Sequence, residues 1–237
     1  MNLIDKIHTE NITWGSRKIR DYLRNQGWKV NRKRIQRLMQ KMQIQVLYPK
    51  RNISRKNLEH RTYPYLLKGL NIEKSNQVWC ADITYIKLAH GYTYLVAIID
   101  WYSKKILSWE LSNTADVHFC KWALESAIRK YGCPEILNSD QGAQFTSPRF
   151  LKILEDNEIK ISMDGKGRAL DNVCIERFWR TLKYDEIYLH EYESMQIARE
   201  RISSFIEKYN SMRPHQTLDG KVPDSVYYSC LNHEHIA

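Results

Sequence analysis

Three acidic residues lie in distinctive sequence motifs: Asp82 in WCADITYI, Asp140 in NSDQGAQF and Glu176 in VCIERFWRTLK. Asp140 and Glu176 are separated by 35 residues. Three carboxylates brought together repel one another and raise one another's pKa values, so such a cluster needs a counter-charge. Mg²⁺ suits this task because it is a hard cation that a few carboxylates hold, while positions stay open for water and phosphate oxygens. We therefore expect Asp82, Asp140 and Glu176 to be catalytic residues and metal ligands.

The expected cofactor is Mg²⁺, with Mn²⁺ as a substitute and two ions per site. Two such ions about 3.5–4 Å apart can activate an attacking oxygen and stabilise a leaving oxygen during in-line displacement at phosphorus. Attack by water would hydrolyse a DNA strand, and attack by a 3′-hydroxyl would join two strands.

The helix predicted around Glu176 also carries basic residues. Lys183 follows Glu176 by seven residues, which places the two side chains about 20° apart around the helix axis. The apolar residues of this helix lie on an adjacent arc that would pack on a sheet. We therefore expect Glu176 to face the metal ions, and Lys183 and Arg180 to bind DNA phosphates.

Residues near the three acids have plainer interpretations as well. Asn172 lies one turn before Glu176 and would either orient it as a second-shell residue or cap the helix. Gln144 would support Asp140, contact DNA, or cap the turn that Gly142 permits. We interpret Asp100, which ends the second predicted strand near the active-site end of the sheet, as structural.

Two further residues near this region are assigned structural roles. His215 in RPHQTL is interpreted as a structural hydrogen-bonding residue. Cys174 is interpreted as a small buried residue.

The elements that must position the acids begin at Gln77. Segments 78–88, 92–100 and 104–112 are rich in β-branched and aromatic residues and predict a three-stranded meander with a turn at His90 and Gly91. A helix over 115–132, a short strand over 134–140, a helix over 147–158, the Glu176 helix and a long helix over 192–210 follow. This order is that of the ribonuclease H-like fold, an α/β fold with a mixed five-stranded sheet and flanking helices. We assign residues 77–237 to this catalytic core with its C-terminal helices.

The front of the chain predicts a small all-α module. Helices over 2–10, 15–26 and 32–42 follow from the spacing of apolar residues, with Gly27 as a stop and Asn31 as an N-cap. A short helix, a turn and a basic helix outline a helix-turn-helix module over residues 1–47. Its DNA-binding candidates are Arg32, Lys33, Arg34 and Arg37. Residues 48–76 are basic and irregular, and are predicted to form a linker.

Charge separates the two parts of the chain. The net charge is +10, and residues 1–76 carry 18 Lys and Arg against 5 Asp and Glu, whereas residues 77–237 carry 19 against 22. A basic module of this kind favours a polyanionic partner over a merely solvated face. The five scattered cysteines argue against a disulfide framework or a zinc site and favour a reducing cytoplasm. No segment is predicted to span a membrane or to act as a targeting signal.

The motifs together resemble the catalytic protein of insertion-sequence transposases of the IS-three family, within the retroviral integrase superfamily. The resemblance rests on the three acidic motifs and on WGSRKIRDYLRNQGWKVNRKRIQRLM, YLVAIIDWYSKKILSW and YNSMRPHQTLDGKVP. It implies an Asp, Asp, Glu triad with 35 intervening residues and a base seven residues after the Glu, here Lys183. It also implies metal-dependent cleavage and transfer of DNA strands, with the element's terminal repeats and target DNA as partners in a bacterial cytoplasm.

The resemblance carries further expectations about assembly. It implies a homo-oligomer on DNA, and a contribution from an upstream reading frame by frameshifting. The zinc-binding His-His-Cys-Cys module of retroviral integrases has no counterpart here, and the helix-turn-helix module takes its place.

Two alternatives remain open from the residues alone. One is a DNA-binding regulator without catalysis that uses only the basic module. The other is a resolvase or RNA-hybrid nuclease built on the same fold.

Overall fold

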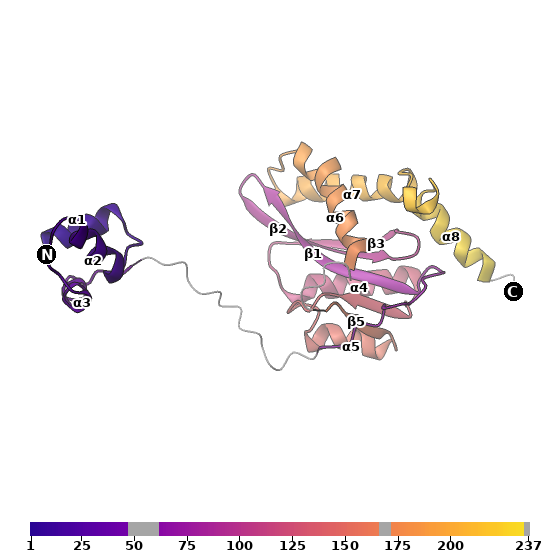
Figure 1. The fold of residues 1–237 in the computed structure, drawn as a ribbon. Helices are drawn as coiled ribbons and strands as arrows, with labels where there is room; N and C mark the ends of the chain where they lie inside the picture. Colours follow the sequence, from indigo (N-terminus) through magenta and orange to yellow (C-terminus); the bar gives the residue numbers. More distant parts are fainter. Residues whose placement is uncertain (47–61, 166–171, 235–237) are drawn as a thin grey trace. The chain divides into compact units, whose positions relative to one another are not determined.

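The computed structural model describes residues 1–46, 62–165 and 172–234 of the chain, with side chains described through residue 230. The chain divides into two compact units, Met1–Asn57 and Leu58–Ala237 (Figure 1). Residues 47–61, which include the first half of the predicted linker, lie outside the described residues. The described part of that linker packs on the second unit, because Leu67 is buried and Tyr65 lies against the same apolar cluster.

The first unit is a three-helix module formed by α1 (Asn2–Glu10), α2 (Ser16–Asn25) and α3 (Arg32–Lys41). Gly27 turns the chain between α2 and α3 with a φ of 87°, a left-handed conformation that glycine adopts without strain. Asn31 then caps α3, and its side-chain oxygen accepts a hydrogen bond from the Arg34 N–H at 2.8 Å. The buried apolar residues of this unit are Ile4, Ile7, Ile19, Leu23, Ile35 and Met39.

The second unit is built on the predicted mixed five-stranded sheet. Its strands are β1 (Val78–Leu88), β2 (Gly91–Asp100), β3 (Ile106–Ser112), β4 (Ile136–Ser139) and β5 (Lys160–Met163), in the order β3-β2-β1-β4-β5. The first three form an antiparallel meander, and β4 and β5 continue the sheet in parallel with β1. Only the start of β1, from Val78 to Ala81, pairs with β4.

Helices cover both faces of this sheet (Figure 1). Because side chains alternate along a strand, Trp79 and Ala81 join the cluster under α4 (Val117–Tyr131) and α5 (Pro148–Asp156), whereas Val78 and Cys80 face α6 (Val173–Asp185) and α7 (Met195–Ser211). The two apolar clusters are therefore separated by the sheet, and Asp82 belongs to the face that α6 covers.

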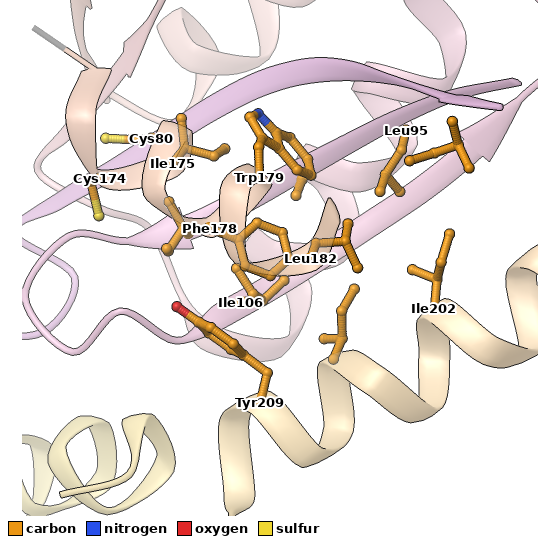
Figure 2. Close-up of a cluster of buried hydrophobic side chains, with 14 of the residues drawn as sticks. Cys80, Leu95, Ile106, Cys174, Ile175, Phe178, Trp179, Leu182, Ile202 and Tyr209 are labelled. Carbon is orange, nitrogen blue, oxygen red and sulfur yellow. The ribbon is translucent and has the colours of Figure 1, made fainter. Parts of the chain in front are cut away.

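Packing fixes the rotation of α6 about its axis. Figure 2 shows its apolar side chains between the sheet and α7, with Leu95 and Ile106 on one side and Ile202 and Tyr209 on the other. The buried residues of α6 are Cys174, Ile175, Phe178, Trp179 and Leu182. Glu176 and Arg180 are consequently exposed, and Lys183 is half-buried.

The C-terminal part holds an element that the sequence did not predict. After the turns η2 (Ile187–Leu189) and η3 (Gln216–Leu218), α8 (Pro223–Glu234) packs back on the unit. Its Tyr227 is fully buried, and the hydroxyl donates to Asn76 Oδ1 at 2.9 Å. Asp224 forms an ion pair with the buried Lys105. Among the helices of the described residues, none is long and apolar enough to cross a membrane.

Candidate active site

Asp82 lies in the middle of β1, where α6 closes over the sheet. The indole Nε1 of Trp179 donates a hydrogen bond to Asp82 Oδ2 at 2.9 Å. The pKa of Asp82 is raised to about 6, mainly because burial desolvates the carboxylate; the Trp179 hydrogen bond opposes this rise, and the negative charges of Asp140 and Glu176 add to it. Asp82 is thus a carboxylate held in a partly dry position and close enough to the two other acids to feel their charge.

Asp140 comes directly after β4, beside Asp82. The last pair between the parallel strands is Ala81 with Ser139, so Asp82 and Asp140 occupy the next position on each chain. Neighbouring strands lie about 4.8 Å apart, and residues in register point to the same face. The sheet therefore brings these two carboxylates together, as the fold order predicted.

A glycine holds the Asp140 side chain in place. The Gly142 N–H donates to Asp140 Oδ1 at 2.9 Å, and a Cβ added at Gly142 would lie only 2.8 Å from that oxygen. Desolvation by the surrounding protein raises the pKa of Asp140, although the residue as a whole is exposed, and the Gly142 hydrogen bond opposes the rise. The predicted tight turn at Gly142 thus also positions a carboxylate.

Glu176 stands in the first turn of α6 and is exposed. Its charge acts on Asp82, which places the three acids within electrostatic range of one another. Across residues 1–46, 62–165 and 172–230, however, no three Asp, Glu, His or Cys side chains lie close enough to bind one metal ion. The structure therefore sets Asp82 next to Asp140 in register and Glu176 within range of the Asp82 charge, but the three carboxylates do not close into one ligand cluster.

The donors themselves fit a hard divalent cation. Asp82, Asp140 and Glu176 offer only carboxylate oxygens, and each ionised carboxylate has about four lone-pair sites, of which the hydrogen bonds from Trp179 and Gly142 occupy one each. Burial and the neighbouring negative charges disfavour the ionised form of Asp82, and a bound cation would stabilise that form. The donor set therefore suits Mg²⁺ in kind, although within the described residues the three carboxylates are not gathered into one ligand cluster.

The predicted DNA-binding residues lie on exposed or half-buried surfaces. Lys183 lines a groove of about 530 Å³ together with Tyr85 and Tyr92 of the β1–β2 hairpin. The Arg180 guanidinium lies 5.7 Å from the centre of the Tyr184 ring. In the first unit, the side chains of Arg32, Lys33, Arg34 and Arg37 are all exposed on α3. DNA contacts by these residues remain predictions.

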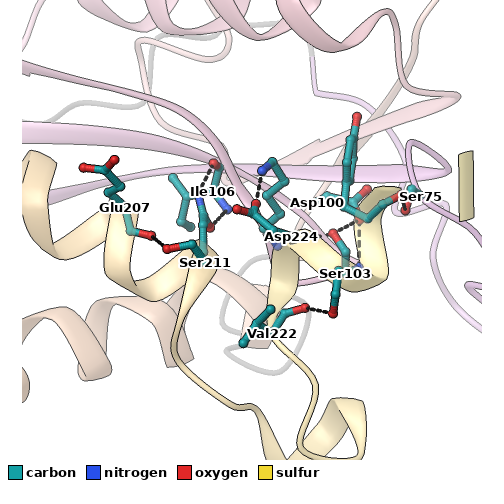
Figure 3. Close-up of polar contacts among 12 residues, drawn as sticks. Ser75, Asp100, Ser103, Ile106, Glu207, Ser211, Val222 and Asp224 are labelled. Carbon is teal, nitrogen blue, oxygen red and sulfur yellow. Dashed lines mark hydrogen bonds and ion pairs between the residues drawn. The ribbon is translucent and has the colours of Figure 1, made fainter. Parts of the chain in front are cut away.

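The prediction that Asp100 lies near the active-site end of the sheet is wrong. Asp100 pairs with Trp79 at the start of β1, three residues before Asp82. It is fully buried and accepts hydrogen bonds from the Ser103 hydroxyl at 2.6 Å and the Ser103 N–H at 2.8 Å (Figure 3). The Asn76 N–H also donates to it, at 2.9 Å. Its role is to organise the β2–β3 turn, which agrees with the structural interpretation.

The supporting residues also differ from expectation. Gln144 donates from Nε2 to the Ala115 carbonyl at 2.8 Å, so it ties the Asp140 loop to the start of α4. Asn172 occupies the N-cap position of α6 but makes no capping hydrogen bond with its side chain, and within the described residues its buried Oδ1 has no partner. Neither residue contacts Asp140 or Glu176 through a hydrogen bond in the described part of the chain.

One supporting residue was missed. Trp179 belongs to the apolar arc by which α6 packs on the sheet, and its indole N–H is also the donor to Asp82. Its position three residues after Glu176 on the same helix was the available signal. A buried tryptophan usually finds an acceptor for its N–H, so a neighbouring carboxylate could have been anticipated.

A mixed sheet in this order, with acids at β1 and at the end of β4 and with a separate three-helix unit, defines an integrase-type catalytic core joined to a helix-turn-helix-like module. Family comparisons agree: residues 72–169 and 157–223 match integrase core domains, and residues 1–52 match an HTH-like domain. The chain belongs to the insertion-sequence transposases of the IS-three family, in the integrase superfamily.

Relatives support this membership along most of the chain. The putative transposase InsK for insertion sequence element IS150 of Escherichia coli strain K12 is 31% identical over 93% of this chain and 80% of its own length. The transposase for insertion sequence element IS904 of Lactococcus lactis is 31% identical over 91% of this chain and 88% of its own. The transposase InsF for insertion sequence IS3A of Escherichia coli strain K12 is 28% identical over 89% and 75%.

Solved structures share the fold. The HTLV-2 integrase catalytic core domain in complex with magnesium matches with a TM-score of 0.55 and 21% identity, over 65% of this chain and 97% of that chain. An integrase chain of the simian T-cell lymphotropic virus intasome matches with a TM-score of 0.57 and 16% identity, over 94% and 74%. At this identity the likeness establishes the fold.

Proposed function

We propose that this transposase is a DDE-type enzyme that cleaves DNA at the ends of an insertion sequence and transfers the strands to target DNA. Its catalytic carboxylates are Asp82, Asp140 and Glu176. One observation carries the proposal: the parallel register of β1 and β4 sets Asp82 beside Asp140, and the Glu176 charge acts on the same carboxylate. The spacing of 35 residues and the names of the relatives support it.

The proposed cofactor is a divalent cation, with Mg²⁺ first, Mn²⁺ as a substitute and two ions per site. When bound, such ions lower the cost of forming the attacking oxygen nucleophile and of releasing the leaving oxygen. Asp82, Asp140 and Glu176 would hold them. In this arrangement the Trp179 indole fixes one oxygen of Asp82, and the Gly142 N–H fixes one oxygen of Asp140.

The proposed substrates are the terminal repeats of the element and target DNA. Lys183 and Arg180 would bind phosphates near the scissile bond, because both project from α6 on the side of Glu176 or next to it. The basic α3 helix, through Arg32, Lys33, Arg34 and Arg37, would recognise the element ends. We also propose that the protein acts as a homo-oligomer on DNA, that an upstream-frame segment contributes to it, and that it is located in the cytoplasm.

A cleavage and strand-transfer assay on duplexes that carry element ends tests the catalytic assignment. Asp82→Asn, Asp140→Asn and Glu176→Gln should each abolish cleavage and joining in Mg²⁺ and in Mn²⁺, while DNA binding stays close to that of the parent. Asp156→Asn is the matched control, because Asp156 is an exposed acid at the end of α5. Robust cleavage by any of the three variants would overturn the triad. Inactivity of the parent with both metals, combined with sequence-specific binding, would favour a regulator instead.

A further inference from the structure

A second basic site lies on the flank of α6 away from Glu176. A cleft of about 730 Å³ is lined by the β2–β3 turn, by α6 and by the segment between α7 and η3. Its cationic side chains are Lys104, Arg177, Arg180 and Arg213. Among the described residues that line it, Asp185 is the single acid. The excess of positive charge indicates an anionic ligand.

The cations are held in place before any ligand arrives. The Lys104 ammonium donates to the Trp101 carbonyl at 2.6 Å and lies over the Trp101 ring. Arg213 is ion-paired with Asp185 across the cleft wall. Arg177 is exposed and makes no ion pair with any residue that the structure describes. The cleft therefore combines anchored side chains with an arginine whose five donors are open to a ligand.

An electrostatic effect on a neighbouring side chain indicates that these charges converge. Burial lowers the pKa of His215, and the cations Arg213 and Lys104 lower it further. Residues that lie far apart in the sequence therefore contribute positive charge to the same cleft. Bringing like charges together costs free energy unless an anion compensates them.

Helix geometry separates this cleft from the candidate active site. Arg177 follows Glu176 by one residue and precedes Lys183 by six, which puts it about 100° from the former and about 120° from the latter around α6. A phosphate bound at Arg177 is therefore not the one that Lys183 would hold beside Glu176.

We propose that Lys104, Arg177 and Arg213 bind the phosphate backbone of duplex DNA at a position separate from the scissile phosphate. The proposal rests on the transposase function only in its choice of DNA as the polyanion. Arginine forks match phosphate oxygens in pairs, and two of the three cations are arginines. The cleft would add affinity and orient the duplex without taking part in the chemistry.

The test compares the full-length double variant Lys104→Gln/Arg177→Gln with the parent and with Arg129→Gln/Lys152→Gln. The control removes two charges from exposed positions on α4 and α5. Binding to a duplex is measured by fluorescence anisotropy across a salt titration. Each lost phosphate contact should lower the slope of log K against log salt by about 0.9 and weaken binding roughly tenfold at 0.1 M salt. The control should change binding about twofold or less.

Two additional variants keep the result interpretable. If the double variant fails to fold, the exposed Arg177→Gln alone should lower the slope by about 0.9. The charge-preserving Lys104→Arg/Arg177→Lys should recover most of the affinity. An unchanged slope in the folded double variant, or an equal loss in the Arg129→Gln/Lys152→Gln control, would overturn the proposal.

Activity separates this proposal from the catalytic one. At saturating duplex, the double variant should cleave in a single turnover at close to the parental rate, whereas Asp82→Asn should bind normally and not cleave. If Asp82→Asn is active, the catalytic assignment of the three acids is wrong, and the binding result for the cleft is unaffected. If the double variant binds DNA normally while Asp82→Asn is inactive, only the DNA-binding role of the cleft is wrong.

Discussion

The partly buried Asp82 makes a quantitative prediction about stability. Its carboxylate is desolvated by the sheet and α6, and the Asp140 and Glu176 charges repel it. Without a cation, the ionised form is therefore disfavoured in the folded protein. Asp82→Asn keeps the size of the side chain and offers an amide oxygen to the Trp179 indole, but it removes the charge. We expect this variant to be inactive and, when metal-free at neutral pH, more stable than the parent.

The magnitude follows from the pKa shift. The folded pKa rises from 3.8 to about 6, and each unit corresponds to about 1.4 kcal/mol. Between these two values the folded state binds more protons than the unfolded state, so the free energy of unfolding falls as pH rises. The loss is complete above about pH 7 and amounts to about 3 kcal/mol. Below about pH 3 the parent carries a largely neutral Asp82 in both states, and the two proteins should be equally stable.

The measurement is urea unfolding of the parent and of Asp82→Asn in EDTA, at intervals from pH 4 to pH 8. The intrinsic fluorescence of the fully buried Trp79 contributes to the unfolding signal of the catalytic unit. The difference between the two proteins is the relevant quantity, because titrations elsewhere in the chain cancel in it. It should grow from about 0.6 kcal/mol at pH 4 to about 3 kcal/mol at pH 7. Adding Mg²⁺ should stabilise the parent more than the variant, by about 2.7 kcal/mol at a concentration 100 times the Kd.

Two results would refute this reasoning. A difference that stays constant from pH 4 to pH 8 would mean that Asp82 is not desolvated as the structure places it. A variant that is less stable than the parent at pH 7 would mean that the ionised carboxylate is a net stabilising partner of Trp179. Asp156→Asn serves as the control, since an exposed acid should show no such pH-dependent gain.

Three further predictions concern the groups around the site. Gly142→Ala should leave the free energy of unfolding within about 1 kcal/mol of the parent but strongly reduce cleavage, because the added Cβ would meet Asp140 Oδ1; parental activity would contradict the role of Gly142. Trp179→Phe should raise the pKa of Asp82 and move the acid limb of the cleavage pH profile to higher pH, since a donor that favours the ionised form is lost; an unmoved limb would argue against it. Lys183→Ala should weaken engagement of the DNA ends without changing the Mg²⁺ requirement, and Lys183→Arg should recover much of the activity. A Lys183→Ala defect cured by extra Mg²⁺ would place Lys183 at the metal site instead.

Local patterns predicted most of the sheet and the main helices. The β-branched and aromatic segments became β1, β2 and β3, and the motif ending in Asp140 became β4 followed by its loop. These predictions succeeded because strand alternation and turn residues are properties of short segments. The pairing of Asp82 with Asp140 could also be anticipated, since it follows from the order of the strands.

Other features depend on contacts between distant segments. The α8 helix was missed because its sequence has no regular apolar face. It packs on the unit through Tyr227 and through the ion pair of Asp224 with Lys105. Pro223 at its first position was a usable signal for a helix start. Asp100 was misplaced because the strand register, rather than its position at a strand end, decides which end of the sheet it occupies. The basic cleft was invisible for the same reason, since Lys104, Arg177 and Arg213 come together only through packing.

The unequal lengths of β1 and β4 explain why the candidate site lies where it does. β4 pairs with β1 only as far as Ala81, so Asp82 is the first residue of β1 beyond the last paired position. At that point the backbone of β1 loses its parallel neighbour, and Asp140 leaves the sheet into its loop. The α6 helix still covers one side of Asp82 through Trp179. This burial raises the pKa of Asp82. If β4 continued in the same register, Asp140 would pair with Asp82 inside the sheet; because β4 ends at Ser139, Asp140 instead lies beside Asp82 in a loop, where it is exposed.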